Sequence, residues 1–395
     1  MTLVEPGRIE SALAAIRPER LLQHAIRLCA APSPTCSARP ALDELAAILA
    51  GEGLAVERPE ADWAEAPAVL VRFDSGRPGR TLQFTGHLDT VPLPFVPPTV
   101  EGGILRGSGA SDMKGGMAAA VEALLALRDS GALTHGGILL TSYDLHEGPW
   151  GDAHQLHALL RDGVFGDGVL IPEYLADRLP LAGRGLGIFE ARIRRPGIPV
   201  HEVLRPAGTA DVLATGCELV RRLHSLSARW AQTPHPLAGA ASFFVGHIQA
   251  GEIFNQSPVE CRVDGTRRWL PGQSQEKVRA DFEALLAQLA SETGTTIESG
   301  YMTPGDAFEL SPDEPLVRAF DAAYAHVTGG RSLPVGAKPF LDDGNAFMGR
   351  AGIPALTHGP AARGAHTTHE EVPVAELERV ARTYAVTALH FCSAA

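Results

Sequence analysis

His87 and Asp89, in the run Thr85–Pro92, form a short motif that could take part in binding a metal ion. On an extended segment, residues two apart point to the same side, while Leu88 between them faces the other way. An imidazole is a common metal ligand, and a nearby carboxylate can hold such a ring in place. The motif alone is weak evidence. It gains weight because further acidic and histidine motifs follow it in order along the chain.

Four more segments carry candidate ligands, namely Asp112 in Gly-Ala-Ser-Asp, Glu147 in His-Glu-Gly, Glu173 in Ile-Pro-Glu and His366 in Gly-Ala-His. Most of them lie where a predicted strand ends or a predicted helix begins. Ligand sites of α/β proteins collect beyond the carboxyl ends of the strands. Two histidines and three carboxylates, one of them bridging, suit a pair of zinc-like ions about 3.5–4 Å apart.

The hydrophobic pattern predicts the elements that must position these residues. A helical pattern over residues 10–52 is broken by prolines at 32–34 into two helices. Strands alternating with long helices indicate an α/β domain with a mostly parallel central sheet. The predicted strands cover residues 68–73, 81–86, 137–143 and 169–172, and a strong helix covers 114–127.

After residue 180 the pattern changes to strands with one solvated face. We expect a strand at 187–194, a helix at 210–223, strands at 241–248 and 259–263, and a helix at 275–289. Helix–strand alternation resumes near residue 310, with elements at 316–327, 353–357 and 374–391. The sequence therefore predicts a catalytic domain formed by 1–183 and 300–395, and an inserted α+β domain at 184–299 with its helices on one face.

Composition excludes several classes of protein. The chain has 395 residues, 45% hydrophobic and 20% charged, as in an ordinary globular protein of about two domains. A net charge of −12 argues against a nucleic-acid or anionic-membrane surface, and no apolar run is long enough to cross a bilayer. Five scattered cysteines indicate reduced thiols, and the first eight residues do not resemble a signal peptide. We therefore expect a cytoplasmic protein.

Taken together, these segments resemble the M20 metallopeptidase family, which includes acetylornithine deacetylase, succinyl-diaminopimelate desuccinylase, aminoacylase-1 and glutamate carboxypeptidases. The run Gly107–Gly116 and the order of the five segments carry the resemblance. It implies two divalent metal ions, zinc first, with manganese or cobalt as alternatives. It also implies a cis peptide after the bridging aspartate.

The resemblance assigns a role to each candidate ligand. His87 and Glu173 would be terminal ligands of one ion, and Glu147 and His366 of the other. Asp112 would bridge the two ions. Asp89 would orient His87 through its second ring nitrogen. We interpret the neighbouring His369 and Glu370 as the solvated start of a helix.

One position departs from the family pattern. Members normally carry two adjacent glutamates, a general base and a ligand, whereas this chain has His146 followed by Glu147. A neutral imidazole can accept a proton, so we hypothesise that His146 is the base or a proton shuttle. It cannot supply the negative charge of a glutamate, and nearby cations should lower its pKa.

Three residues of the inserted domain match family positions for substrate contact: His201, Asn255 and Arg268. In the family the histidine reaches the partner subunit's site and helps to stabilise the oxyanion. A guanidinium suits a substrate carboxylate, although Arg268 could equally form a salt bridge within the domain, and Arg267 competes for the role. The resemblance thus implies a homodimer formed through the inserted domain.

The implied function is hydrolysis of an amide bond in a small N-acyl amino acid or dipeptide with a free carboxylate, by water that the metal ions activate. Because His146 replaces the usual base, two alternatives stay open. One is changed chemistry on the same fold, such as deamination or amide formation. The other is a metal or ligand binder that no longer hydrolyses.

Overall fold

The computed structural model describes residues 4–149 and 151–393. The chain forms two compact units. The first consists of Met1–Leu181, Leu310–Ala337 and Asp342–Ala395, and the second of Ala182–Glu309 with Lys338–Leu341. Residues 1–3 and 394–395 lie outside the described residues. The predictions about the N-terminal residues and about the outer limits of the catalytic domain fall partly on them. The roles of the two units as catalytic and inserted domain stay a prediction.

A mixed sheet forms the centre of the first unit, with the order β1-β2-β6-β3-β7-β17 across the described residues. The strands β6, β3, β7 and β17 run parallel, and β2 and β1 are antiparallel at one edge. Strands buried on both faces are rich in Val, Leu and Ile, as a sheet covered by helices requires. The bounds are β1 (Val56–Glu57), β2 (Val69–Asp74), β3 (Thr81–His87), β6 (Gly137–Tyr143), β7 (Gly168–Ile171) and β17 (Ala355–Thr357).

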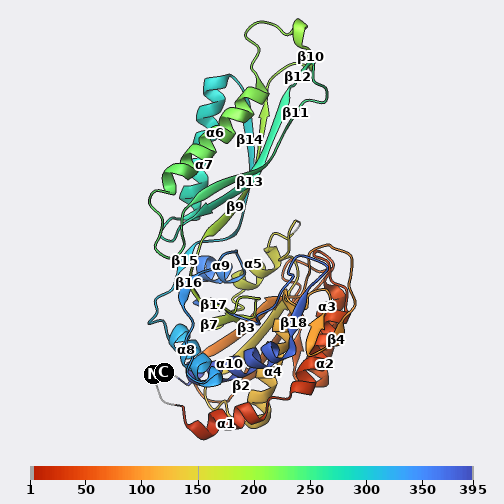
Figure 1. Cartoon of the computed structure of the whole chain (residues 1–395), viewed down its shortest axis with the longest axis vertical. Coiled ribbons are helices and arrows are strands. Elements are labelled where there is room, and N and C mark those ends of the chain that lie inside the picture. Colours follow the sequence, from red (N-terminus) through yellow and green to blue (C-terminus); the bar gives the residue numbers. More distant parts are fainter. Residues whose placement is uncertain (1–3, 150, 394–395) are drawn as a thin grey trace. The chain divides into compact units, whose positions relative to one another are not determined.

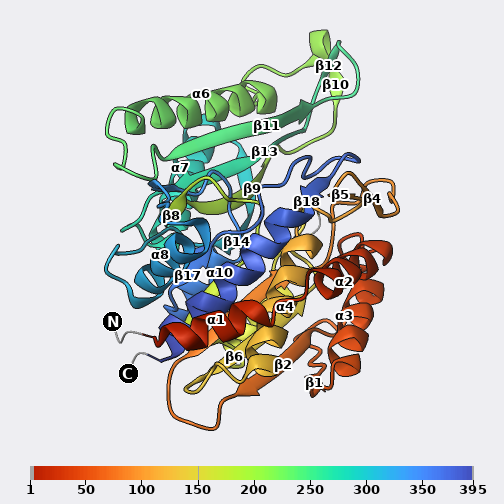
Figure 2. The ribbon, with the colours of Figure 1, turned by 60° about the horizontal axis from the view of Figure 1, so that its bottom comes forward.

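Helices pack around this sheet, as Figure 2 shows for α1, α2, α4 and α10. α4 and α10 are in contact with each other and with β3, and nearly all of α4 is buried. The bounds are α1 (Pro6–Ala14), α2 (Pro18–Ala30), α3 (Arg39–Gly51), α4 (Lys114–Ser130), α5 (His154–Arg161), α8 (Pro315–Thr328), α9 (Gly344–Ala346) and α10 (Val374–Cys392). A short π-helical turn, η2 (Phe347–Ala351), follows α9.

The two helices predicted for residues 10–52 are three in the structure. The additional break falls at Arg17, where the backbone is extended, and α2 begins at Pro18. Proline has no N–H and a fixed φ, so it suits the first position of a helix and prevents the preceding helix from continuing through it. The break at 32–34 was predicted from its prolines, whereas the break at Arg17 was not.

The second unit is a four-stranded antiparallel sheet, in the order β11-β13-β9-β14, packed against α6 and α7 (Figure 1). Phe189, Phe243 and Phe282 pack together in its core. The predicted strand–helix–strand–strand–helix order is confirmed, but β14 was missed. The bounds are β9 (Gly185–Arg194), α6 (Val212–Trp230), β11 (Ser242–Ala250), β13 (Glu260–Trp269), α7 (Gln275–Thr293) and β14 (Thr296–Gly305).

β14 escaped prediction because Gly, Ser and Pro interrupt its sequence, so no alternation of apolar residues is visible. Its pairing with β9 fixes it as a strand.

The remaining elements are short, and no described helix combines the length and apolar character that a membrane span needs. They are β4 (Thr99–Glu101), β5 (Ile104–Arg106), β8 (Leu179–Gly183), β10 (Val200–His201), η1 (Glu202–Leu204), β12 (Gln256–Ser257), β15 (Phe308–Glu309), β16 (Val335–Ala337) and β18 (Glu371–Pro373).

Candidate metal centre

His87 is the last residue of β3, at the carboxyl end of the central sheet. Its ring is fully buried, and its Nδ1 lies 2.9 Å from the backbone carbonyl oxygen of Asp89. A carbonyl only accepts, so in the neutral ring Nδ1 carries the proton and Nε2 keeps a free lone pair. This is the tautomer that a metal ligand needs.

The structure brings the five predicted ligands together at this edge of the sheet. The Nε2 of His87 lies 3.3 Å from Oδ1 of Asp112 and 3.4 Å from Oε1 of Glu173. The Nε2 of His366 lies 3.2 Å from Oδ2 of Asp112 and 3.2 Å from Oε2 of Glu147. The two oxygens of Asp112 therefore face different imidazoles. That is the arrangement expected of a carboxylate between two ions.

Several buried atoms of this cluster have no hydrogen-bond partner among the described residues: Nε2 of His87, Oδ1 of Asp112 and Oε2 of Glu173. Buried polar atoms are normally satisfied, so such a group calls for an unseen partner. Divalent cations would satisfy all three, and imidazole with carboxylate is a donor set that zinc accepts. Ligand atoms of His87, Asp112 and Glu147 also lie within 4.8 Å of one another. The residues present fit a metal centre.

The pKa values of the site's own ionisable groups also favour added positive charge. Burial and the charge of Asp112 raise the pKa of Glu173 to about 8. Hydrogen bonds to Asp112 and Glu147 raise the pKa of His366 to about 10. Carboxylates crowded in a buried site compete for protons, and imidazoles become protonated to balance them. Divalent ions would replace those protons.

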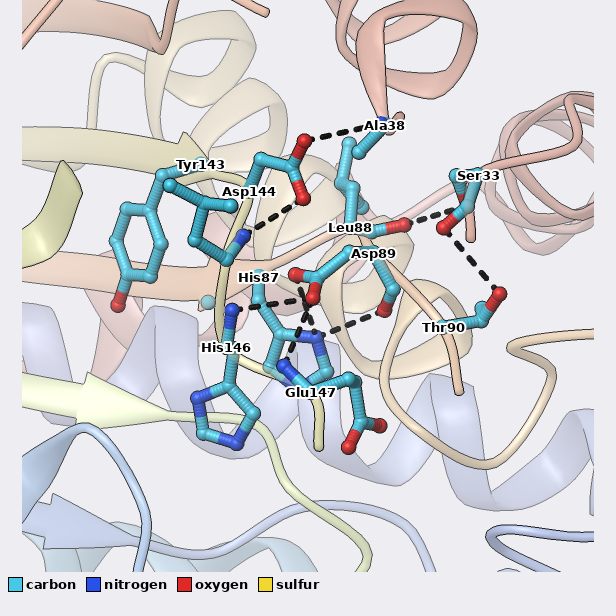
Figure 3. A network of polar contacts seen from close by, with 12 residues as sticks. Ser33, Ala38, His87, Leu88, Asp89, Thr90, Tyr143, Asp144, His146 and Glu147 are labelled. Atoms are coloured by element: carbon cyan, nitrogen blue, oxygen red, sulfur yellow. Dashed lines mark hydrogen bonds and ion pairs between the residues drawn. The ribbon is translucent and has the colours of Figure 1, made fainter. Parts of the chain in front are cut away.

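Asp89 contacts both His87 and the turn that carries Glu147. Its Oδ1 is 3.5 Å from Nδ1 of His87, while the backbone carbonyl makes the shorter contact with the ring. Oδ2 accepts the backbone N–H groups of His146 and Glu147, at 3.0 and 2.8 Å (Figure 3). Asp89 therefore fixes two candidate segments at once, β3 and the turn after β6. Its carboxylate is buried and acts mainly on the second of them.

His146 lies beside the cluster, and its ring stacks on that of His87 with centroids 4.0 Å apart and planes 2° apart. Its Nδ1 is 2.7 Å from Oδ1 of Asp343, whose Oδ2 accepts a hydrogen bond of 2.6 Å from the hydroxyl of Tyr143. Burial and His87 act to lower the pKa of His146, but Asp343 outweighs them and raises it to about 9. Sequence reasoning missed both Asp343 and Tyr143. The run Asp-Gly-Asn was visible, but nothing local connects it to His146.

Glu370 corrects an expectation of the sequence analysis. It is 4% exposed and precedes β18, whereas a solvated helix start was predicted. Its carboxylate accepts four hydrogen bonds from the loop that carries Asp112. Acidic residues in polar sequence are usually solvated, and only the return of the chain to this loop shows the buried role. The donors are the backbone N–H groups of Gly109, Ser111 and Asp112 and the hydroxyl of Ser111.

Two backbone features mark the loop before α4 and the first turn of this helix. The peptide between Asp112 and Met113 is cis, as expected. Gly116 lies so close to the carbonyl of Pro172 that a β-carbon there would collide with it. This close approach joins α4 to the segment that carries Glu173.

The three remaining predicted residues lie in the second unit. The Nδ2 of Asn255 is 3.0 Å from Nε2 of His201, so these two are neighbours. Arg268 is on β13 and forms no ion pair with any described carboxylate, and burial lowers its pKa to about 10. Its competitor Arg267 is buried with its guanidinium 4.0 Å from the ring centroid of Trp230. Packing therefore occupies Arg267 and leaves Arg268 as the candidate for a carboxylate.

Known proteins resemble this chain along most of its length. Residues 83–390 match peptidase family M20/M25/M40. The chain is 27% identical to a succinyl-diaminopimelate desuccinylase of Cereibacter sphaeroides over 376 residues, covering 89% of this chain and 94% of that protein.

Solved structures share the fold. A tripeptidase from Staphylococcus aureus superposes with a TM-score of 0.77 at 20% identity, covering 95% of this chain and 98% of the other. A dinuclear metal binding peptidase of the M20 family from Bacillus subtilis has a TM-score of 0.67 at 16% identity, covering 94% and 97%. The predicted fold class, an α/β domain with a separate antiparallel sheet and helices, is confirmed. With most of its length matched to one family, this chain belongs to peptidase family M20/M25/M40 and is an M20-type metallohydrolase.

Proposed function

We propose that this enzyme cleaves the amide bond of a small N-acyl amino acid or dipeptide that carries a free carboxylate. The convergence of two imidazoles and three carboxylates, with the oxygens of Asp112 facing His87 and His366 separately, carries the proposal. Buried atoms without partners at this point support a site for two divalent ions, zinc first and manganese or cobalt as alternatives.

We assign His87 and Glu173 to one ion, Glu147 and His366 to the other, and Asp112 to both. The contacts among these side chains support that assignment. When bound, such ions would polarise the scissile carbonyl and ease the deprotonation of water. Asp89 would hold the ring of His87, and the backbone of the turn that carries Glu147, in fixed positions.

His146 would move the proton. It lies against His87, beside the proposed metal centre, and is the ionisable side chain at the position of the family's general base. In this proposal it takes a proton from the attacking water and gives it to the leaving amine.

Arg268 would bind the substrate carboxylate. A half-buried guanidinium that forms no ion pair with a described carboxylate is suited to receive one from a ligand. Asn255 and His201, which contact each other, would bind the acyl group and the oxyanion. The negative net charge and the paired surface charges give no support to a nucleic-acid or membrane partner.

The exposed edge of β11 supports a homodimer through the second unit. β11 is the outer strand of its sheet, and Phe244 on it is 65% exposed, with Ile248 also exposed. An apolar edge strand left open invites pairing with another chain. The cysteines Cys29, Cys36, Cys217, Cys261 and Cys392 are all free thiols. This agrees with a cytoplasmic location.

The proposal can be tested with purified protein reconstituted with Zn²⁺, Mn²⁺ or Co²⁺. We expect two ions per chain by elemental analysis, and turnover of at least one class in a panel of N-succinyl, N-acetyl and N-formyl amino acids and dipeptides. Asp112→Asn should reduce both metal content and turnover. Asp313→Asn, at an exposed surface pair, is the matched control and should change neither. A protein that takes up two ions but turns over nothing in the panel would refute the hydrolytic assignment, and one that takes up none would refute the metal centre.

Changed chemistry on the same fold is a second candidate, and one observation favours it. Without metal ions, Asp343 raises the pKa of His146 to about 9, and a protonated imidazole is a poor base; bound divalent ions would lower this pKa. Losing a general base lowers a rate by about 10²–10⁴-fold. Under this second reading, His146→Glu should increase the hydrolysis of ordinary amides by a similar factor. If His146→Glu lowers the rate instead, native hydrolysis through His146 is supported.

A further inference from the structure

The group that holds His146 in place is a buried carboxylate from a distant part of the chain. Oδ1 of Asp343 lies 2.7 Å from Nδ1 of His146, and Asp343 is 3% exposed. The backbone carbonyl of Asp343 accepts N–H groups from the turn that follows, at Ala346 and Phe347, so the carboxylate stands on a fixed backbone. The position of the His146 ring is therefore set by the structure around Asp343.

Both oxygens of Asp343 are engaged. While Oδ1 faces His146, Oδ2 accepts the hydroxyl hydrogen of Tyr143, which is itself buried at the end of β6. Figure 3 shows the ring of His146 beside that of His87. An ionised carboxylate only accepts hydrogen bonds. In neutral His146, the proton must therefore be on Nδ1, and Nε2 is left with its lone pair.

Ring orientation decides what that lone pair can do. His87, His146 and Glu173 each place a ligand atom within 4.8 Å of the others, so distance alone would allow His146 to bind the same ion as His87. An imidazole lone pair lies in the plane of its ring. The two ring planes are parallel to within 2° and stacked, so one ion cannot lie in both. His146 is thus a neighbour of the ligand His87, and its Nε2 is free to take a proton.

The charges of this pair match those of the missing glutamate. A glutamate base has charge −1 and becomes neutral when it accepts a proton. Neutral His146 together with ionised Asp343 has charge −1, and it becomes neutral when Nε2 accepts a proton. A histidine alone would pass from neutral to +1 beside the metal ions, which electrostatics disfavours.

We propose that Asp343 is the positioning residue that lets His146 replace the glutamate base, by fixing the tautomer with Nδ1 protonated and supplying the negative charge. This rests on the proposed hydrolytic function. In the reaction, an O–H bond of water breaks as the Nε2–H bond of His146 forms. The water oxygen bonds to the amide carbon. The Nε2–H bond then breaks as the N–H bond of the leaving amine forms and the amide C–N bond is cleaved, so the pair returns to its starting charge.

The tautomer of His146 tests the proposal without reference to activity. Nitrogen-15 NMR of the zinc-reconstituted protein distinguishes a protonated ring nitrogen from one with a lone pair, and the signals of His146 are those lost in His146→Gln. We expect Nδ1 protonated in the wild-type protein. In Asp343→Asn, the hydroxyl of Tyr143 still donates to the amide oxygen of the substituted side chain, so the amide NH₂ faces Nδ1 of His146. Because this NH₂ group is a donor, Nδ1 must accept, and the ring proton should shift to Nε2. Adding Tyr143→Phe frees the amide to turn and should restore Nδ1–H.

Kinetics provides the second arm. Asp343→Asn should lower kcat by about 10²–10⁴-fold with KM and zinc content unchanged, because the wrong tautomer offers no acceptor at Nε2. Asp264→Asn is the matched control, since Asp264 lies 3.0 Å from Nδ1 of His247 in the second unit. It should leave kcat and the His146 signals unchanged.

Each outcome separates the two proposals. A wild-type spectrum with the proton on Nε2, or Asp343→Asn with wild-type tautomer and kcat, would overturn the role of Asp343. If no substrate is turned over, the hydrolytic function fails, and the spectra of the wild-type and variant proteins still decide whether Asp343 sets the tautomer. If Asp343→Asn does not fold, the wild-type spectrum decides alone.

Discussion

Removing the carboxylate of Glu370 should unfold the loop that presents Asp112. Four donors converge on this buried side chain, three on Oε2 and one on Oε1. Each hydrogen bond to a charged group contributes about 1.5–3 kcal/mol, and a buried donor left without a partner costs about 1–3 kcal/mol. These contributions do not add fully, because water can enter the space left by the side chain.

For Glu370→Ala we expect a loss of about 3–5 kcal/mol in the free energy of unfolding, the range for breaking a buried charged network. Glu370→Gln should cost less, about 1–3 kcal/mol. Its amide oxygen can take the three donors at the Oε2 position, while its NH₂ group meets the N–H of Gly109. The order of the two variants is therefore set by the positions of the donors.

Urea unfolding of the metal-free protein, followed by circular dichroism, measures these values, and a zinc titration measures the effect on the site. Loss of an outer group that orients a ligand weakens metal binding by about 10–100-fold. Glu371→Gln is the matched control: the neighbouring residue pairs with Arg106 at the surface and should contribute no more than about 1 kcal/mol. If the free energy of unfolding of Glu370→Ala lies within about 1 kcal/mol of the wild-type value, and the variant binds zinc equally well, Glu370 does not hold the loop in this way.

Three further predictions follow from packing, protonation and metal binding. Gly116→Ala should lower the free energy of unfolding in urea by about 1–3 kcal/mol, because its β-carbon would meet the carbonyl of Pro172. Gly7→Ala, in open space on α1, is the control and should not destabilise the protein. Equal losses of stability in the two variants would contradict the close approach at Gly116. Burial lowers the pKa of His358 to about 3, below its unfolded value of 6.5, so the unfolded state binds more protons between these two pH values. In that window the free energy of unfolding should fall by about 1.4 kcal/mol per pH unit as the pH decreases, and His358→Phe should remove this contribution. An unchanged slope would refute this source of acid sensitivity. Chelation with EDTA should lower the Tm of the zinc-loaded protein, and added zinc should restore it, because ions that bind only the folded state stabilise it; a Tm independent of EDTA would contradict the metal centre.

The sequence alone was sufficient for the order of the motifs, for the fold class and for most elements. His87, Asp112, Glu147, Glu173 and His366 are each marked by residues immediately around them, and the structure places their side chains together. Buried strands and amphipathic helices were visible because their patterns have periods of two and 3.6 residues. Such signals are contained in a dozen residues or fewer.

What surrounds the ligands was decided only by the tertiary structure. Asp343 meets His146 across 197 positions of the chain, and Glu370 meets Asp112 across 258. Neither pairing leaves a local pattern, and β14 became a strand only by pairing with β9. Long-range contacts depend on where the backbone returns to the sheet edge, and this depends on the packing of the whole unit. The sequence thus determined which groups can bind metal, while folding determined which charges hold them there.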